Sequence, residues 1–291
     1  MADGRRTSAA SIRQRLLDIA RTQGRVHEVV LVRFALERLL YRLSISPHRN
    51  RFALKGGMLV TQWIDGGHRE TRDADFLGFG ESGPDDLKAA FAEIMAVGAD
   101  DALAFDVGAL RADQIREGME YGGIRLRTTA YLERTRIPVT VDIGFGDAVA
   151  PKLEPLNYRS LLGMEEPCIL AYPPAAVVAE KFQAIVALGL INGRMKDFHD
   201  LWAIPKALDI RAADLDAAIG ATFDRRKTAI PSARPDGLSR AFVDDAAKRR
   251  QWRNYALSIG LDTVSLAEVV DAAWELVGPS CMRLTSVEGG Q

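Results

Sequence analysis

Two cysteines in 291 residues, Cys168 and Cys281, are too few for a disulfide framework. They form no CxxC pair and no histidine cluster lies near them, which excludes a zinc knuckle. The N-terminal residues lack the apolar core of a secretion signal, and the sequence shows no 18-residue apolar run. These absences predict a cytoplasmic protein without a membrane partner.

An excess of one charge is also missing, because 38 Lys and Arg residues balance 39 Asp and Glu residues. The net charge of −1 excludes a histone-like polyanion binder and an acidic solvating tail. The balance conceals a gradient along the chain. Residues 81–120 hold ten acidic residues against three basic ones, whereas residues 225–253 hold nine basic residues against three acidic ones.

The hydrophobic content of 47% is ample for a buried core. Apolar residues at spacings of three and four predict helices over residues 9–22, 28–43, 58–64, 85–96, 175–188, 196–204, 212–224 and 264–276. Short apolar or alternating segments predict strands over residues 51–54, 73–79, 102–107, 124–131 and 137–145. This order predicts an α+β N-terminal lobe, residues 1–172, and a mainly helical C-terminal lobe, residues 173–291.

Two aspartates one residue apart, Asp73 and Asp75, begin the second predicted strand. Side chains alternate along a strand, so both carboxylates are expected on one face. Carboxylates in this arrangement suit Mg²⁺, which takes one or two of them together with substrate phosphates. Asp142 lies inside the apolar segment PVTVDIGF, and from a neighbouring strand it would complete a two-metal site.

A glycine pair, Gly56 and Gly57, stands between the first predicted strand and the helix that follows it. Glycine lets backbone N–H groups approach a phosphate at a helix N-terminus, where the helix dipole favours negative charge. Such a pair is also common in an ordinary tight turn. The order strand, glycine pair, helix, paired aspartates and a third aspartate favours the phosphate site.

That order resembles the polymerase-β-type nucleotidyltransferase superfamily. More narrowly, four motifs resemble the abortive-infection AbiEii/AbiGii nucleotidyltransferase toxins, which include the MenT-like toxins. The motifs are FALKGGMLV, TRDAD, VAEKFQAI and RMKDFHDLW, in that order over roughly residues 50–205. The resemblance implies a polymerase-β-like lobe with a mixed sheet, a role in phage defence and a cognate antitoxin as partner.

The resemblance also implies site residues. It assigns Asp73 and Asp75 to metal, Gly56 and Gly57 to the phosphates and Lys181 to the triphosphate, and it marks Asp197 and Asp200. With Asp142 the aspartates would hold two Mg²⁺ ions, and the predicted nucleotide-binding residues also include Lys55 and Arg194. Lys181 is a lone cation within an apolar helix, where it could instead extend to solvent or pair with Glu180. Asp197 and Asp200 are three residues apart on one helix face, so they either contact substrate or orient Lys181 or Arg194.

The basic end of the chain is the predicted RNA-binding segment, with Trp252 and Tyr255 available to stack a base. A solvated basic face is the alternative. The residues concerned are Arg225, Arg226, Lys227, Lys248, Arg249 and Arg250.

Thr71, two residues before Asp73, is a predicted regulatory site. A phosphate on its hydroxyl would add about −1.5 to −2 charges beside the metal-binding carboxylates and repel a triphosphate. The resemblance implies such inhibition at an equivalent serine. The alternative is an ordinary β-favouring threonine.

The predicted function is Mg²⁺-dependent transfer of nucleotides from an NTP to the 3′ end of tRNA, which would block translation. Two alternatives remain open. One is nucleotidylation of a small molecule or a protein, and the other is a non-catalytic module that binds RNA or a partner.

Overall fold

The computed structural model of the chain describes residues 8–64, 71–115 and 123–288. They fold as two compact units. The first unit holds the described residues 8–62, 71–115, 123–146 and 154–171. The second holds residues 63–64, 147–153 and 172–288.

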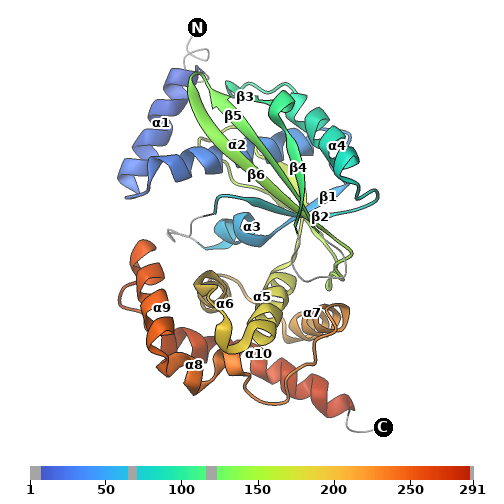
Figure 1. The fold of residues 1–291 in the computed structure, drawn as a ribbon, viewed down its shortest axis with the longest axis vertical. Helices are drawn as coiled ribbons and strands as arrows, with labels where there is room; N and C mark the ends of the chain where they lie inside the picture. The colour runs from blue at the N-terminus through green and yellow to red at the C-terminus, as the bar shows by residue number, and fades with distance from the viewer. Residues whose placement is uncertain (1–7, 65–70, 116–122, 289–291) are drawn as a thin grey trace. The chain divides into compact units, whose positions relative to one another are not determined.

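The first unit is built on an eight-stranded mixed sheet (Figure 1). The strand order is β3-β5-β6-β2-β1-β8-β7, with β4 paired to β5. β2 pairs with β6 and β1 with β8 in parallel, and the other neighbours are antiparallel. The strands are β1 Phe52–Lys55, β2 Ala74–Gly78, β3 Leu103–Phe105, β4 Arg111–Ile115, β5 Gly123–Leu132, β6 Thr135–Phe145, β7 Glu154–Asn157 and β8 Cys168–Ala171.

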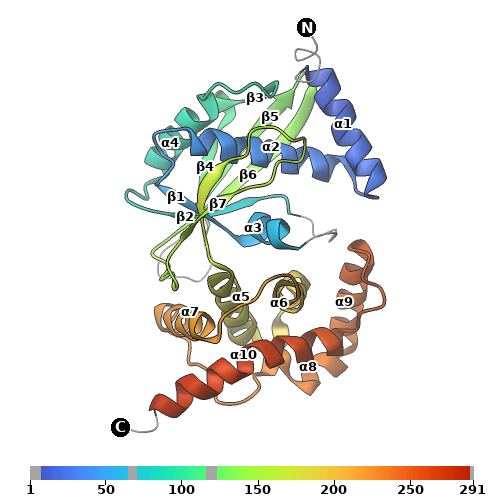
Figure 2. The ribbon, with the colours of Figure 1, turned by 180° about the vertical axis from the view of Figure 1, so that it is seen from behind.

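One face of the sheet packs on helices (Figure 2). Helix α2 (His27–Ser44) lies against β6 and α4 (Pro84–Ala96) against β4, while α1 (Ala9–Thr22) packs on α2. The rings of Phe52, Phe76 and Phe91 meet at centroid distances of 5.0–6.2 Å, which places the even-numbered side chains of β2 under α4. Asp75 therefore points to the opposite face, because strand side chains alternate.

A buried ion network fastens α2 to the segment before β3. The carboxylate of Asp101, which is 0% exposed, accepts hydrogen bonds from Arg38 Nε at 3.0 Å and from Arg42 Nη1 and Nη2 at 2.6 and 2.9 Å. The Leu103 N–H donates to the same carboxylate at 3.1 Å. Both guanidinium groups are buried, and Asp101 is the carboxylate that they share, while Arg38 Nη1 also lies 3.8 Å from Glu37 Oε1.

The second unit is helical in its described part. Helix α5 (Pro174–Leu188) packs on α6 (Met195–Ala207) and α7 (Ala212–Arg225). Phe182 meets Phe223 at 5.3 Å and Phe198 stacks on Phe242 at 5.0 Å, so aromatic contacts join the helices. The remaining helices are α8 Arg240–Asp244, α9 Ala246–Ser258 and α10 Leu266–Glu288.

One stretch of this unit, Pro174–Ile191, is long and apolar enough to cross a membrane, with a mean hydropathy of 1.6 over 18 residues. The expectation that no such run exists was therefore wrong. The stretch includes Glu180 and Lys181, and half of it is buried inside the protein. Buried core helices meet the same length and hydropathy criterion, so this stretch is weak evidence for a membrane span.

The α+β class, the mixed sheet and the helical C-terminal region are confirmed. The sequence pattern did not predict β4, β7, β8, α8 and α9. β4 has the sequence RADQI, which lacks apolar alternation because the strand is largely exposed, and β7 and β8 are only four residues long. α9 buries only Trp252 and Ala256, too few to produce a helical apolar period.

Both cysteines are free, as the sequence predicted, with Cys168 exposed and Cys281 buried. Burial raises the pKa of the Cys281 thiol to about 11, so it stays protonated at neutral pH.

Replacing Asp101 tests the buried network. Asp101→Asn removes the carboxylate that compensates two buried guanidinium groups, so we expect the free energy of unfolding to fall by about 3–5 kcal/mol. Urea titration followed by circular dichroism measures the loss. The matched control is Asp100→Asn, an exposed neighbour of the same type, which should change stability by less than about 0.5 kcal/mol. Equal effects of the two variants would contradict the network's importance.

Candidate active site

Strand register places five charged residues in a row across the sheet, and the outermost is Asp113 of β4, which lies opposite Arg125 of β5. Lys55 of β1 lies opposite Asp75 of β2. Asp75 is the register partner of Asp142 in β6, and Asp142 is the partner of Arg125 in β5. Residues aligned in this way share one face, and here it is the face opposite the phenylalanine cluster. Two carboxylates thus lie between two cations.

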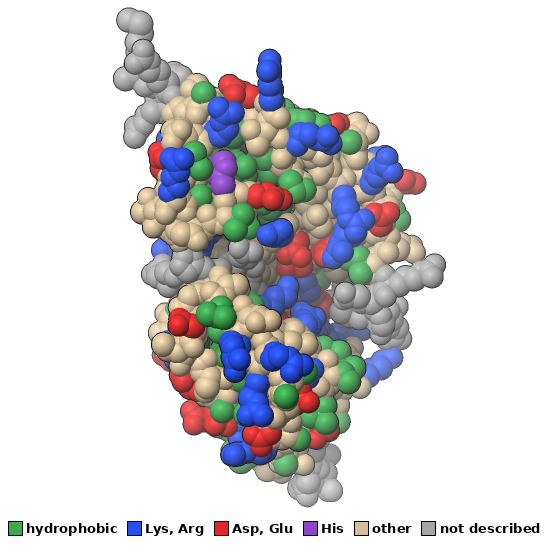
Figure 3. Space-filling view, turned by 60° about the vertical axis from the view of Figure 1, so that its left-hand side comes forward, with side chains coloured by type: hydrophobic (Ala, Val, Ile, Leu, Met, Phe, Trp, Pro, Cys, Tyr) green, Lys and Arg blue, Asp and Glu red, His purple; other side chains and the backbone are tan. Residues whose placement is uncertain are grey.

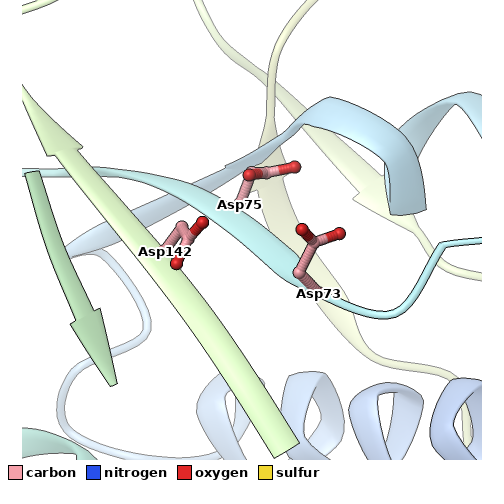
Figure 4. Close-up of side chains that lie close together, drawn as sticks. All are labelled: Asp73, Asp75 and Asp142. Carbon is pink, nitrogen blue, oxygen red and sulfur yellow. The ribbon is translucent and has the colours of Figure 1, made fainter. Parts of the chain in front are cut away.

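Asp73, immediately before β2, joins Asp75 and Asp142 in one cluster (Figure 4). Each of the three residues offers a carboxylate oxygen, and these oxygens lie within 4.8 Å of one another. All three side chains are partly exposed. The structure therefore brings together the three aspartates that the sequence singled out, two from the start of β2 and one from β6.

Gly56 makes room for one of these carboxylates. Its φ of +67° is in the left-handed region, and a Cβ added there would lie 1.9 Å from Asp75 Oδ2. The next N–H, of Gly57, donates to the same oxygen at 3.4 Å. The pair forms the first turn of α3 (Gly56–Trp63), so it has a role that the sequence did not predict, which is to hold Asp75.

Asp142 is held by a bidentate ion pair. Arg125 Nε donates to Asp142 Oδ1 at 2.6 Å and Arg125 Nη2 donates to Oδ2 at 2.5 Å. Both carboxylate oxygens are therefore engaged by one planar guanidinium group. Lys55 lies on the same face, since a Cβ on Gly144 would meet its Nζ at 3.9 Å.

Sequence analysis missed Arg125, although a signal for it was present. β5 and β6 form a hairpin with the tight turn Glu133–Arg134, because Leu132 pairs with Thr135. Counting back from that turn places Arg125 opposite Asp142. The alternation in IRLRTTAY, combined with the turn, could have revealed the ion pair.

Thr71 is buried, and its hydroxyl donates to the Asp73 backbone oxygen and to Asp73 Oδ1, both at 3.2 Å. These contacts orient the Asp73 carboxylate. The threonine thus contacts a member of the cluster, although it lies before β2 and not on the strand itself.

The remaining predicted catalytic residues form a cluster of their own in the second unit. Lys181 Nζ contacts Asp197 Oδ1 at 2.9 Å and Asp200 Oδ2 at 2.6 Å. Arg194 Nε lies 2.7 Å from Asp197 Oδ2, and His199 Nδ1 lies 3.2 Å from Asp200 Oδ1. Both aspartate side chains are 0% exposed. Their geometry favours orienting Lys181 over direct contact with a substrate.

The basic residues differ in what they contact. Arg226 donates to Gln183 Oε1 at 2.8 Å and to Glu180 Oε1 at 2.9 Å, so it fastens α7 to α5. Lys248 Nζ donates to the Asn192 carbonyl at 2.9 Å. Such contacts engage both side chains within the protein.

Arg249 and Arg250 of α9 are exposed, as is Lys227, whereas Arg225 is half-buried. Figure 3 shows Lys and Arg side chains gathered on the side of the second unit where α9 lies. Trp252 is buried and its Nε1–H donates to the Val264 carbonyl at 2.7 Å. The expectation that Trp252 stacks a base was therefore wrong, because its ring belongs to the core.

Residues 38–275 match the model of a family described as "Nucleotidyl transferase AbiEii toxin, Type IV TA system". The match covers most of the chain, so the chain belongs to the AbiEii family of nucleotidyltransferase toxins. A family of type IV toxin–antitoxin systems implies an antitoxin partner. No curated protein matches the chain.

Two solved structures from H. pylori are similar to the chain. One is a candidate nucleotidyltransferase with 14% sequence identity and a TM-score of 0.46. The alignment covers 88% of this chain and 96% of the H. pylori chain. The other, JHP933, has 13% sequence identity and a TM-score of 0.41. The alignment covers 88% of this chain and 92% of JHP933.

The three carboxylates suit a divalent metal in both donor type and spacing. Hard cations such as Mg²⁺ take oxygen ligands, and a two-metal site needs bridging carboxylates within a few ångströms. Gly56 provides the space in which Asp75 reaches this cluster. Among the residues that the structure describes, this is the one group of three acidic, histidine or cysteine side chains close enough to hold an ion.

Gly56→Ala tests the contact between the glycine and Asp75. The new methyl group combines a left-handed φ with a clash against the carboxylate, so we expect the free energy of unfolding to fall by about 2–4 kcal/mol. Denaturant titration measures it.

Gly24→Ala is the matched control for this substitution. Gly24 has a similar φ of +61°, and an added Cβ would meet nothing within 4 Å. Backbone strain alone should cost about 1–2 kcal/mol there. Equal losses in the two variants would show that Asp75 does not require the glycine.

Proposed function

We propose that this protein transfers nucleotides from an NTP to the 3′ end of an RNA, with tRNA as the acceptor. The observation that carries the proposal is the cluster of Asp73, Asp75 and Asp142 on one face of the sheet, in a chain of a nucleotidyltransferase toxin family. Addition to the acceptor end of tRNA would block translation and arrest growth, which suits a toxin.

The three aspartates would hold two Mg²⁺ ions. When bound, such ions neutralise the triphosphate and polarise the α-phosphate under attack. The chain's own groups then do the positioning. Asp73 and Asp75 would hold the ions beside the nucleotide's phosphates, and Asp142 would help to deprotonate the attacking 3′-hydroxyl. The 3′-oxygen would bond to the α-phosphate as pyrophosphate leaves. Catalysis by this arrangement is mainly positioning and charge neutralisation.

Of the predicted phosphate-binding groups, Lys55 and the N–H groups of Gly56 and Gly57 belong to the first unit, and Lys181 and Arg194 belong to the second. Lys55 lies on the carboxylate face, and the glycine pair opens helix α3. Lys181 is held by two fully buried carboxylates, which restrict its ammonium group to one position. That restriction supports a role for Asp197 and Asp200 in orienting Lys181.

The RNA backbone would meet the exposed arginines of α9, Arg249 and Arg250. Exposed guanidinium groups gain from releasing the counterions of a phosphate backbone. Arg226 and Lys248 are half-buried and donate hydrogen bonds within the second unit, so they contribute less to this surface. Arg249 also donates to the Asp244 carbonyl, at 2.8 Å, but stays exposed.

A labelling assay tests the proposal. Purified protein is incubated with tRNA, Mg²⁺ and each radiolabelled NTP in turn, and we expect label at the 3′ end of tRNA from at least one NTP. Asp73→Ala or Asp142→Asn should lower the rate by roughly a hundredfold or more, because each removes a metal ligand. Asp113→Asn, an exposed aspartate of β4, is the control and should retain the parent rate.

The assay also separates the alternatives. Activity without RNA, and no effect of Arg249→Gln with Arg250→Gln, would indicate a small-molecule or protein acceptor. RNA binding without Mg²⁺ dependence or transfer would indicate a non-catalytic module. The proposal fails if no NTP labels tRNA and Asp73→Ala is as toxic on expression as the parent.

Thr71 is the proposed point of regulation. Its hydroxyl contacts Asp73 at 3.2 Å, so a phosphate there would add negative charge directly beside a metal-binding carboxylate. Mass spectrometry of the protein co-expressed with its antitoxin should find about 80 Da on the peptide that contains Thr71, as expected for a phosphoryl group. Thr61, another threonine of the same unit, is the internal control and should be unmodified. An inhibited protein with unmodified Thr71 would contradict this regulation.

A further inference from the structure

Arg125 forms an ion pair with Asp142, the third carboxylate of the cluster. Its Nε and Nη2 donate separately to the two oxygens of Asp142, at 2.6 and 2.5 Å. The pair is partly sheltered, with 33% of the arginine side chain and 17% of the aspartate side chain exposed. A divalent cation that binds Asp142 must share these oxygens with the guanidinium group or displace it.

We propose that Arg125 is a positioning residue that controls when Asp142 binds a divalent cation. The inference rests on the metal site of the proposed function. With Arg125 in place, the carboxylate is aligned toward Asp73 and Asp75 but its charge is already neutralised. The nucleotide-free protein therefore binds the cation weakly, and the ions enter with the triphosphate.

Charge accounts for the weak binding. The three carboxylates of Asp73, Asp75 and Asp142 bring three negative charges into one cluster, and Arg125 cancels one of them at hydrogen-bond distance. A cation approaching Asp142 is repelled by the guanidinium group at short range. The phosphates of an NTP supply the missing negative charge, so nucleotide and cation bind together.

A second ion pair on the same strand differs from this one, although its aspartate, Asp113, lies opposite Arg125 in the strand register. Arg127 also lies on β5 and faces the same side of the sheet, and its Nη1 donates to Asp113 Oδ2 at 2.7 Å. That pair is half exposed on both sides, at 53% and 55%, and its aspartate is outside the cluster. It offers a matched control with the same residue types.

The experiment measures binding of Mn²⁺ to the nucleotide-free protein by calorimetry, without RNA. R125Q removes the positive charge and the bidentate hydrogen bonding to Asp142, and we expect it to bind Mn²⁺ roughly tenfold more tightly than the parent. R125K keeps the charge but cannot engage both oxygens, so its affinity should rise only about threefold. R127Q should stay within about twofold of the parent.

The gain must also depend on Asp142, so adding D142N to R125Q should abolish it. Unchanged or weaker Mn²⁺ binding in both Arg125 variants, or a gain that persists without Asp142, would overturn the proposal. Circular dichroism melting in EDTA verifies that each variant is folded. If R125Q is not folded, the Mn²⁺ affinity of R125K compared with that of the parent decides the outcome.

Transfer of nucleotides does not enter this measurement, which keeps the two proposals separable. If tRNA is not labelled but the Mn²⁺ affinities follow the expected order, the RNA activity alone is refuted. Labelled tRNA with equal affinities would refute only the role of Arg125.

Discussion

The mutual repulsion of three carboxylates is the constraint on which the arrangement of the first unit depends. Their oxygens lie within 4.8 Å, a spacing that the backbone pairing of β2 with β6 imposes through the register of Asp75 and Asp142. Three features offset the repulsion. Arg125 neutralises Asp142, Lys55 lies on the same face, and Gly56 leaves space for Asp75. The sheet thus holds the carboxylates in an arrangement that would not persist between free side chains.

The second charged cluster shows the opposite balance. Lys181 and Arg194 face two buried carboxylates, so the positive and negative charges are equal in number and the cluster is neutral before any ligand arrives. Such pairing fixes the geometry of Lys181, since an uncompensated ammonium group at that depth would be costly. One cluster therefore carries excess charge suited to a cation, while the other presents a single oriented ammonium group.

Much of the fold was predictable because it follows local periodicity. Helices α1, α2 and α5 and the strands β5 and β6 have the expected positions to within a few residues, since their apolar residues recur at helical or alternating spacing. β4 and α9 were missed for the same physical reason, because exposed elements bury too few side chains to leave a period. Trp252 was misassigned to base stacking, since composition does not distinguish a buried ring from an exposed one.

The sequence by itself determined the composition of the site: the glycine pair, the two aspartates one residue apart, the third aspartate in an apolar strand and the lysine in an apolar helix. Only the tertiary structure decided their partners. Cross-strand register places Arg125 against Asp142, and helix packing buries Asp197 and Asp200 against Lys181. The register of Arg125 and Asp142 follows from the hairpin turn once the two strands are known to pair, whereas the contacts of Lys181 depend on helix packing and burial that no local pattern encodes.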